Sequence, residues 1–313
     1  MTILLLDTAS LYYRAYYALP ETLTAPDGTP VNAIRGLLDT TAAIVSARGH
    51  ERVVACWDDD WRPQWRVDLV PTYKTHRVAS EGDGAALADE EDVPDTLAPQ
   101  VDILRELLPR LGVPVVGAPD AEADDVIAHL ARRTDDRVDI ASGDRDLVQL
   151  VDDRVTLLFT GGSSASRGGR PWVEIDPTTA QQRYGVPAHL YADLAILRGD
   201  PSDGLPGAPG IGEKTATALV RAFGALPQIL AAAEDPASGT PMTPAVRRRL
   251  LDARDDLLSA ERVVRLDGTG RAGQGRMPRA TRVDPRSALS AADEWGVQAS
   301  ARRLLRACQV VAE

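Results

Sequence analysis

The sequence is poor in cysteine and contains no long apolar run. Its two cysteines, Cys56 and Cys308, cannot form a disulfide framework or a zinc-ligand set, which indicates a reducing compartment. No apolar run approaches the roughly 18 residues that a membrane span needs. The N-terminal segment lacks the basic region of a signal peptide, and Asp7 ends its apolar stretch early. We therefore expect a cytoplasmic protein without a membrane partner.

Basic residues are fewer than acidic residues in the sequence. The chain of 313 residues has 35 Lys and Arg against 46 Asp and Glu, which gives a net charge of −11. This balance argues against a simple nucleic-acid coat protein, because binding to phosphates favours net positive charge. It does not exclude nucleic acid if the acidic side chains gather around metal ions. The length fits one large domain or two smaller ones.

The first two-thirds of the chain alternate short apolar runs with segments of helical periodicity. This alternation predicts an α/β fold in which helices flank a parallel sheet. After residue 176 the strand signals stop and helices follow, so we expect a domain boundary there. The last helices should return to the core through Leu304 and Leu305. Expected strands are Ile3–Leu6, Arg52–Trp57, Val113–Gly117, Arg137–Ala141 and Arg154–Phe159, and expected helices include Val31–Ala47, Asp95–Arg110 and Ala121–Arg133.

Residues 61–94 interrupt this alternation. The segment begins with basic and aromatic residues and then becomes small and acidic. Long insertions in compact domains are usually functional or disordered. We expect an excursion that passes over the active face of the sheet.

Acidic residues directly follow most of the expected strands. Because the carboxyl ends of parallel strands meet at one edge of a sheet, these carboxylates should converge on one crevice. The acids concerned are Asp7, Asp58, Glu122, Asp124, Asp125, Asp144 and Asp146.

Such a cluster of like charges is unstable by itself. Either several of the acids stay protonated or divalent cations lie among them. An oxygen-only ligand set favours Mg²⁺ or Mn²⁺ over zinc. For any single Asp near a helix start, capping of the helix is the simpler explanation. Acids at four successive strand ends favour a metal site.

A second motif spans residues 199–216 and is rich in glycine and proline. It is not a P-loop, because Glu213 separates Gly212 from Lys214. A dinucleotide-binding fingerprint also fails, because Thr215 stands where the third glycine should be. What remains is a tight hairpin between two helices whose backbone N–H groups can approach a phosphate. A helical turn without a ligand is the alternative.

Together these motifs resemble the 5′-nuclease (flap endonuclease) family, and most of all the 5′-nuclease domain of bacterial DNA polymerase I. The resemblance runs almost from end to end and rests on blocks in the same order. These blocks are Leu6-Asp7 with Tyr12-Tyr13-Arg14-Ala15-Tyr16, Trp57-Asp58, Tyr73-Lys74-Thr75-His76-Arg77, Glu122-Ala123-Asp124-Asp125-Val126-Ile127, Ser142-Gly143-Asp144-Arg145-Asp146 and residues 200–216.

The resemblance implies a PIN-like nuclease domain over residues 1–176, a helical arch over about 61–94, and a helical DNA-binding region over 177–313. In that region a helix–three-turn–helix over about 190–222 would grip duplex DNA and hold K⁺. The implied metal ligands are Asp7, Asp58, Glu122, Asp124, Asp125, Asp144, Asp146, Asp200 and Asp203. Implied catalytic residues are Tyr13, Arg14, Arg66 and Lys74, and implied DNA-binding residues are Arg77, Gly207, Gly210, Ile211, Gly212, Lys214 and Thr215.

The implied function is a structure-specific 5′ nuclease, both 5′-3′ exonuclease and 5′-flap endonuclease, acting in DNA replication and repair. We expect two or more Mg²⁺ or Mn²⁺ ions and phosphoryl transfer to water. We also expect a monomer that binds DNA with a 5′ end or flap and that a polymerase or sliding clamp recruits. The alternatives are a PIN-type ribonuclease and a DNA-junction protein without catalysis.

Overall fold

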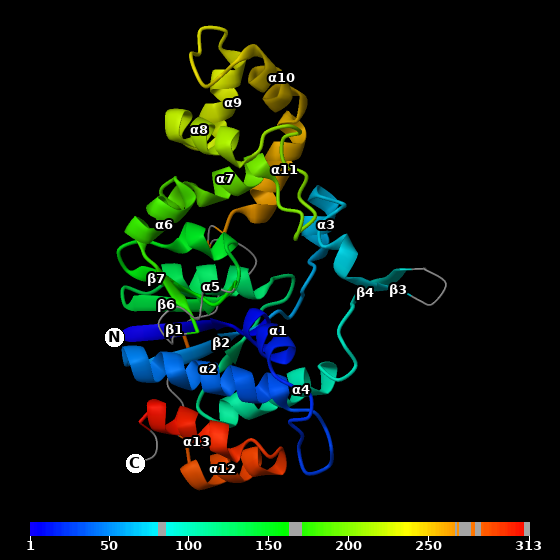
Figure 1. The fold of residues 1–313 in the computed structure, drawn as a ribbon, viewed down its shortest axis with the longest axis vertical. Helices are drawn as coiled ribbons and strands as arrows, with labels where there is room; N and C mark the ends of the chain where they lie inside the picture. Colours follow the sequence, from blue (N-terminus) through cyan, green and yellow to red (C-terminus); the bar gives the residue numbers. More distant parts are fainter. Residues whose placement is uncertain (81–85, 163–170, 267, 269–276, 279–282, 310–313) are drawn as a thin grey trace.

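A six-stranded sheet forms the centre of the molecule (Figure 1). The computed structural model describes residues 1–80, 86–162, 171–266, 268, 277–278 and 283–309. The strand order is β5-β2-β1-β6-β7-β8, and all neighbours are parallel except β8, which runs antiparallel to β7. The strands are β1 (Thr2–Asp7), β2 (Arg52–Cys56), β5 (Val115–Val116), β6 (Arg137–Ser142), β7 (Val155–Phe159) and β8 (Val173–Ile175).

The parallel α/β sheet predicted from the sequence is therefore confirmed for five strands, and β8 makes the sheet mixed. The sequence pattern missed β8 because three residues at a sheet edge are too few to show an alternation. Side chains of β1 alternate between two apolar layers, as the pleat of a strand requires. Ile3 and Leu5 face one layer, and Leu4 and Leu6 face the other.

One layer consists of helices from the first 110 residues and from the C-terminal end of the chain. It contains α1 (Thr8–Ala18), α2 (Asn32–Arg48), α4 (Ala98–Arg110), α12 (Pro285–Glu294) and α13 (Gln298–Ala307). Helix α13 lies against α2, and Leu304 and Leu305 are fully buried there (Figure 1). The predicted return of the C-terminal helices to the core is confirmed.

The other layer begins with α5 (Ala123–Arg132) and continues into a helical region at the top of Figure 1. Short 3₁₀ turns, η2 (Asp146–Leu150) and η4 (Ala188–Leu190), connect this region to the sheet. Among the described residues no single helix is long and apolar enough to cross a membrane. Only the pair α8 (Glu213–Phe223) and α9 (Leu226–Glu234) reaches that length and apolarity together, and it is bent by 88°. The region comprises α6 (Pro177–Tyr184), α7 (Tyr191–Arg198), α8 (Glu213–Phe223), α9 (Leu226–Glu234), α10 (Pro244–Asp252) and α11 (Arg254–Val264).

The excursion at residues 61–94 differs from the helical arch that we expected. Its described residues form a short helix at the base, α3 (Gln64–Leu69), and the 3₁₀ turn η1 (Thr75–Arg77). Beyond them β3 (Val78–Ser80) and β4 (Ala86–Glu91) pair as an antiparallel hairpin that projects to the right in Figure 1. The sequence between these strands contains two glycines, which disfavour a continuous helix. Residues 81–85 of the expected arch lie outside the described residues.

Candidate active site

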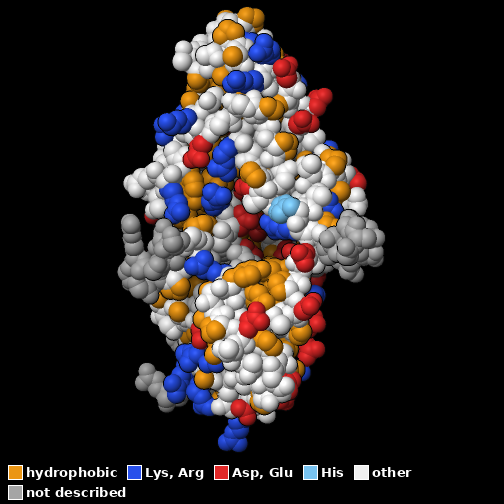
Figure 2. Space-filling view, turned by 45° about the vertical axis from the view of Figure 1, so that its right-hand side comes forward, with side chains coloured by type: hydrophobic (Ala, Val, Ile, Leu, Met, Phe, Trp, Pro, Cys, Tyr) orange, Lys and Arg blue, Asp and Glu red, His pale blue; other side chains and the backbone are white. Residues whose placement is uncertain are grey.

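Seven of the predicted carboxylates line two adjoining cavities at the carboxyl edge of the sheet. The larger cavity, of about 240 Å³, is lined by Asp7, Asp58, Glu122, Asp124 and Asp144. The smaller one, of about 20 Å³, shares three of these acids and adds Asp146 and Asp203. Acidic side chains are visible in the central hollow of the molecule in Figure 2. The convergence predicted from the strand ends is thus what the topology produces.

Asp7 is fixed at the end of β1 by two neighbours. Its Oδ1 accepts a hydrogen bond from the Ser10 backbone N–H at 3.2 Å, so that Asp7 caps helix α1. Its Oδ2 accepts from the hydroxyl of Ser142, at the end of β6. The same hydroxyl accepts from the backbone N–H of Asp144 at 2.8 Å. Ser142 therefore ties together the acids that follow two adjacent strands.

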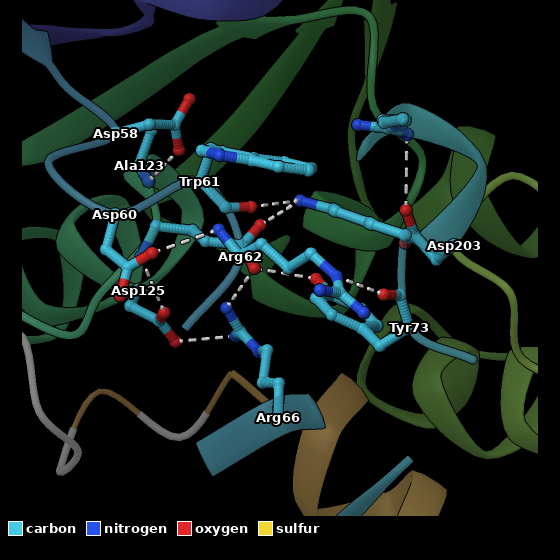
Figure 3. A network of polar contacts seen from close by, with 12 residues as sticks. Asp58, Asp60, Trp61, Arg62, Arg66, Tyr73, Ala123, Asp125 and Asp203 are labelled. Carbon is cyan, nitrogen blue, oxygen red and sulfur yellow. Dashed lines mark hydrogen bonds and ion pairs between the residues drawn. The ribbon is translucent and has the colours of Figure 1, made fainter. Parts of the chain in front are cut away.

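The start of helix α5 organises a second group of acids. The Asp58 carboxylate accepts from the Ala123 backbone N–H at 2.6 Å (Figure 3). Glu122 and Asp125 form a capping box at the same helix start. Carboxylates at this helix start can therefore both cap α5 and face the cavities, because the N–H groups of a helix start stabilise negative charge.

Basic side chains from the excursion surround Glu122. Lys74 Nζ forms an ion pair with Glu122 Oε2, and Arg66 does so with Oε1 at 2.7 Å. The Tyr73 hydroxyl donates to Oε1 at 2.7 Å. Arg66 also reaches Asp125 at 3.0 Å, a contact drawn in Figure 3. Glu122, Lys74 and Arg66 are buried, so the ion pairs of Glu122 act in a medium of low polarity.

The backbone of Lys74 is held in an uncommon conformation. Its φ of 47° lies in the left-handed region, which costs free energy for a residue other than glycine. Its N–H donates to the Asp203 carbonyl at 3.0 Å, and the Thr72 hydroxyl donates to the Gly204 carbonyl at 2.7 Å. The turn after α7 therefore positions Lys74 at the cavity.

The acids respond differently to burial. Burial and the neighbouring Asp58 raise the pKa of Asp7 to about 7, although the Ser142 hydrogen bond opposes this. Burial, with smaller contributions from nearby charges, raises the pKa of Asp203 to about 6 and the pKa of Asp124 well above its ordinary value. Burial also acts on Glu122, but Lys74 and Arg66 outweigh it and hold the pKa of Glu122 below its ordinary value.

The donor set fits divalent cations such as Mg²⁺. The Asp124 and Asp146 carboxylates make no hydrogen bond or ion pair with another described residue, and burial together with Asp144 raises the pKa of both. Such carboxylates lack the countercharge that a cation supplies. In the described part of the chain no three acidic, His or Cys side chains already enclose a metal position.

Of the remaining predicted residues, some line a cavity and others do not. Asp125 and Asp200 line neither: Asp125 pairs with Arg66, and Asp200 accepts from the Ser202 backbone at 2.9 Å. Arg77 lines the larger cavity and pairs with Asp203 at 3.3 Å.

On α1, Tyr13 lines the larger cavity, whereas Arg14 is exposed and does not. The turn between α7 and α8 carries Gly207, Gly210, Ile211 and Gly212, and the first turn of α8 carries Lys214 and Thr215.

Sequence reasoning missed three residues of the site. Tyr73 and Ser142 belong to the motif blocks Tyr73-Lys74-Thr75-His76-Arg77 and Ser142-Gly143-Asp144-Arg145-Asp146, but their hydroxyl contacts depend on the tertiary fold. Glu91, from the end of β4, also lines the larger cavity and accepts a hydrogen bond from Tyr13. No sequence signal distinguishes Glu91 from its acidic neighbours.

Two family profiles match the chain. The 5′-3′ exonuclease N-terminal resolvase-like domain matches residues 2–185, and the 5′-3′ exonuclease C-terminal SAM fold matches residues 186–271. The chain belongs to the 5′-3′ exonuclease family. A relative named 5′-3′ exonuclease from Streptomyces coelicolor is 48% identical over 310 residues, which cover 96% of this chain and 98% of the relative. DNA polymerase I of Mycobacterium bovis is 37% identical over 229 residues, 72% of this chain and 23% of the polymerase.

Solved structures agree on the fold. The T5 5′-exonuclease with bound zinc superposes with a TM-score of 0.66 at 16% identity, covering 98% of this chain and all of that one. The catalytic core of Rad2 in complex with DNA substrate gives a TM-score of 0.59 at 16% identity, covering 100% and 92% of the two chains. The recognition of a 5′-nuclease from the sequence motifs is confirmed.

Proposed function

We propose that this family member is a structure-specific 5′ nuclease that hydrolyses DNA phosphodiesters with divalent Mg²⁺ or Mn²⁺. The observation that carries the proposal is the set of seven carboxylates along two adjoining cavities, with Lys74 between them. Membership of the 5′-3′ exonuclease family supports it, as does the likeness in fold to the zinc-bound T5 5′-exonuclease and to the catalytic core of Rad2 in complex with DNA substrate.

The acids divide into two groups that would each hold an ion. Asp58, Glu122 and Asp124 lie on the larger cavity, and Asp144, Asp146 and Asp203 on the smaller one. Divalent ions in such sites supply Lewis acidity and activate a water molecule.

The protein's own residues orient the substrate. Lys74 and Arg77 line the larger cavity and would bind the scissile phosphate. Lys74 then exchanges its ion pair with Glu122 for one with a phosphate oxygen. Arg66 keeps its pairs with Glu122 and Asp125 and so holds the Glu122 side chain in place. Tyr13 would stack on a base near the 5′ end.

The turn between α7 and α8 would bind duplex DNA beyond the cleavage point. Its glycines let backbone N–H groups approach a phosphate, and the α8 start and Lys214 add positive charge. We propose that its backbone carbonyls hold K⁺. We also propose that a domain boundary lies near residue 176. The protein would act as a monomer that a polymerase or sliding clamp recruits in replication and repair.

The test is cleavage of a 5′-labelled flap duplex with Mg²⁺, Mn²⁺ or EDTA, beside a matched blunt duplex and single-stranded RNA. We expect metal-dependent cutting of the DNA at or near the 5′ end or flap junction, and none in EDTA. Cutting of RNA alone would support the PIN-type ribonuclease instead. Binding of the flap without cutting would support the junction-binding protein.

A further inference from the structure

One buried glutamine joins the acid cluster to the chain beyond α11. Gln149 lies in the turn η2, which begins at Asp146, and only 8% of it is exposed. Its Nε2 donates to the Asp146 carbonyl at 2.9 Å and to the Val264 carbonyl at 3.0 Å. Its Oε1 accepts from the Leu266 backbone N–H at 2.9 Å. Both amide hydrogens and the amide oxygen are therefore used inside the protein, which leaves this side chain without a donor for a substrate.

These bonds connect segments that are far apart in the sequence. Gln149 and Leu266 are separated by 117 residues. In Figure 1 the chain descends from α11 toward the sheet at this point. The helical region above the sheet is thus tied directly to the turn that carries a predicted metal ligand.

The backbone of Asp146 is held by neighbouring side chains, whereas its carboxylate is not. The Asp146 N–H donates to Asp144 Oδ1 at 2.8 Å, and the Asp146 carbonyl accepts from Gln149. The carboxylate makes no hydrogen bond or ion pair with another described residue. Its placement on the smaller cavity therefore depends on the backbone that Gln149 helps to fix.

The same glutamine holds an apolar part of the wall of that cavity. Val263, Val264 and Leu266 line the smaller cavity together with Asp146, and all three apolar residues are buried. The bonds from Gln149 to Val264 and Leu266 fix the backbone from which two of these side chains project. One amide group thus connects the acid to the apolar side chains that bound the same cavity.

We propose that Gln149 is a positioning residue for the divalent cation that the smaller cavity would hold. Residues that orient a metal ligand tune the affinity for the metal, and the apolar side chains around a site control how much water reaches it. Loss of the Gln149 amide would release both the Asp146 backbone and the apolar wall. The inference rests on the proposed function and adds a residue that acts through Asp146, without touching the substrate.

The test combines cleavage of a 5′-flap duplex over a range of Mg²⁺ with binding of Mn²⁺ in the absence of DNA, followed by electron paramagnetic resonance. Gln149→Met removes all three hydrogen bonds and keeps an unbranched side chain. Gln149→Glu keeps an acceptor for the Leu266 N–H and loses both donors, and it carries the test if Gln149→Met does not fold. Thermal unfolding shows which variants are folded.

The matched control is Gln100→Met on α4, in the other apolar layer. Gln100 is also buried, and its side-chain amide also makes three hydrogen bonds. They join it to Asn32 Oδ1 at 2.9 Å, the Thr96 carbonyl at 2.9 Å and the Ala33 N–H at 2.8 Å. The control therefore removes the same kind and number of bonds away from the acids.

We expect both Gln149 variants to raise the Mg²⁺ concentration for half-maximal cleavage and to weaken the binding of at least one Mn²⁺ ion. Each effect should be about 10-fold to 100-fold, the range typical of residues that support a metal ligand. Binding of the flap duplex in Ca²⁺ should stay at the parent level, and Gln100→Met should match the parent in metal dependence.

Parent-like Mg²⁺ dependence and Mn²⁺ binding in a folded Gln149 variant would overturn the inference. An equal loss in Gln100→Met would also overturn it, because the effect would then follow from lost stability alone. If the unaltered protein neither binds Mn²⁺ nor cleaves the flap, the proposed function fails as well. If the unaltered protein does both and the variants match it, only the role of Gln149 is overturned.

Discussion

Replacing Arg66 by glutamine tests how the site tolerates its buried charges. Arg66 is 3% exposed and joins two carboxylates, Glu122 at 2.7 Å and Asp125 at 3.0 Å. The variant leaves the carboxylates in place and removes the cation. Glu122 then depends on Lys74 alone for countercharge, and Asp125 loses its ion pair.

Breaking a buried ion pair by removing one partner costs about 3–5 kcal/mol, because the other charge stays buried without compensation. Lys74 still pairs with Glu122, so we expect the lower end of the range, a fall of about 3 kcal/mol in the free energy of unfolding. Pairing holds the pKa of Glu122 below its ordinary value of 4.5, so its stabilising effect is present above that value. The difference between variant and parent should therefore shrink as the pH falls below 4.5.

Urea unfolding at neutral and acidic pH measures this difference. The control is Arg105→Gln, because Arg105 pairs with Asp59 at 2.6 Å on the surface, with side chains 53% and 27% exposed. An exposed pair contributes at most about 1 kcal/mol. A loss for Arg66→Gln no larger than that of the control would refute the reasoning.

Three further predictions concern the metal, pH and the turn. Excess Mg²⁺ or Mn²⁺ should raise the unfolding temperature, since a ligand at 100 times its Kd adds about 2.7 kcal/mol. An equal shift with NaCl of matched ionic strength would contradict this. In EDTA, the folded protein holds the Asp7 proton more tightly than the unfolded chain does, because the pKa of Asp7 is raised from 3.8 to about 7. Protonated Asp7 therefore stabilises the fold below pH 3.8, and this stabilisation is lost as the pH rises through about 7. Urea titrations across this window check the sign, and a gain attributable to Asp7 would contradict it. Gly204→Ala would put a Cβ 2.0 Å from a backbone carbonyl of the adjoining segment, so we expect lost stability and cleavage, whereas Gly239→Ala has open space and should match the parent by both measures.

The acid cluster could be predicted from the sequence because it depends on topology. Asp7 follows β1, Asp58 follows β2, and Asp144 follows β6; once the strands are parallel, these positions share one edge. The same argument covers the acids at 122–125, which follow the expected strand Val113–Gly117, and the motif blocks added the acids at 200 and 203. The strand and helix bounds were close for another reason, because segments with clear periodicity are the most readable part of a sequence.

The contacts that organise those acids could not be predicted. Lys74 and Glu122 are 48 residues apart and meet only because the excursion folds back over α5. The hairpin of β3 and β4, which replaces the expected helical arch, depends on pairing between short and weakly patterned segments. Ser142 could be read as part of a motif, but its link between Asp7 and Asp144 is visible only in the structure.

The most direct test of the central claim is single-turnover cleavage of a 5′-flap duplex by the protein and by Asp146→Asn, as Mg²⁺ is titrated. The Asp146 carboxylate makes no hydrogen bond or ion pair with another described residue, so removing its charge should take away metal binding and leave the fold intact. We predict that the variant binds the flap as tightly as the parent in Ca²⁺ but cleaves it at least about 100-fold more slowly, from the several kcal/mol that a metal supplies to the transition state. Cleavage by Asp146→Asn at the parent's rate and the parent's Mg²⁺ dependence would contradict the assignment of the acid cluster as the catalytic metal site.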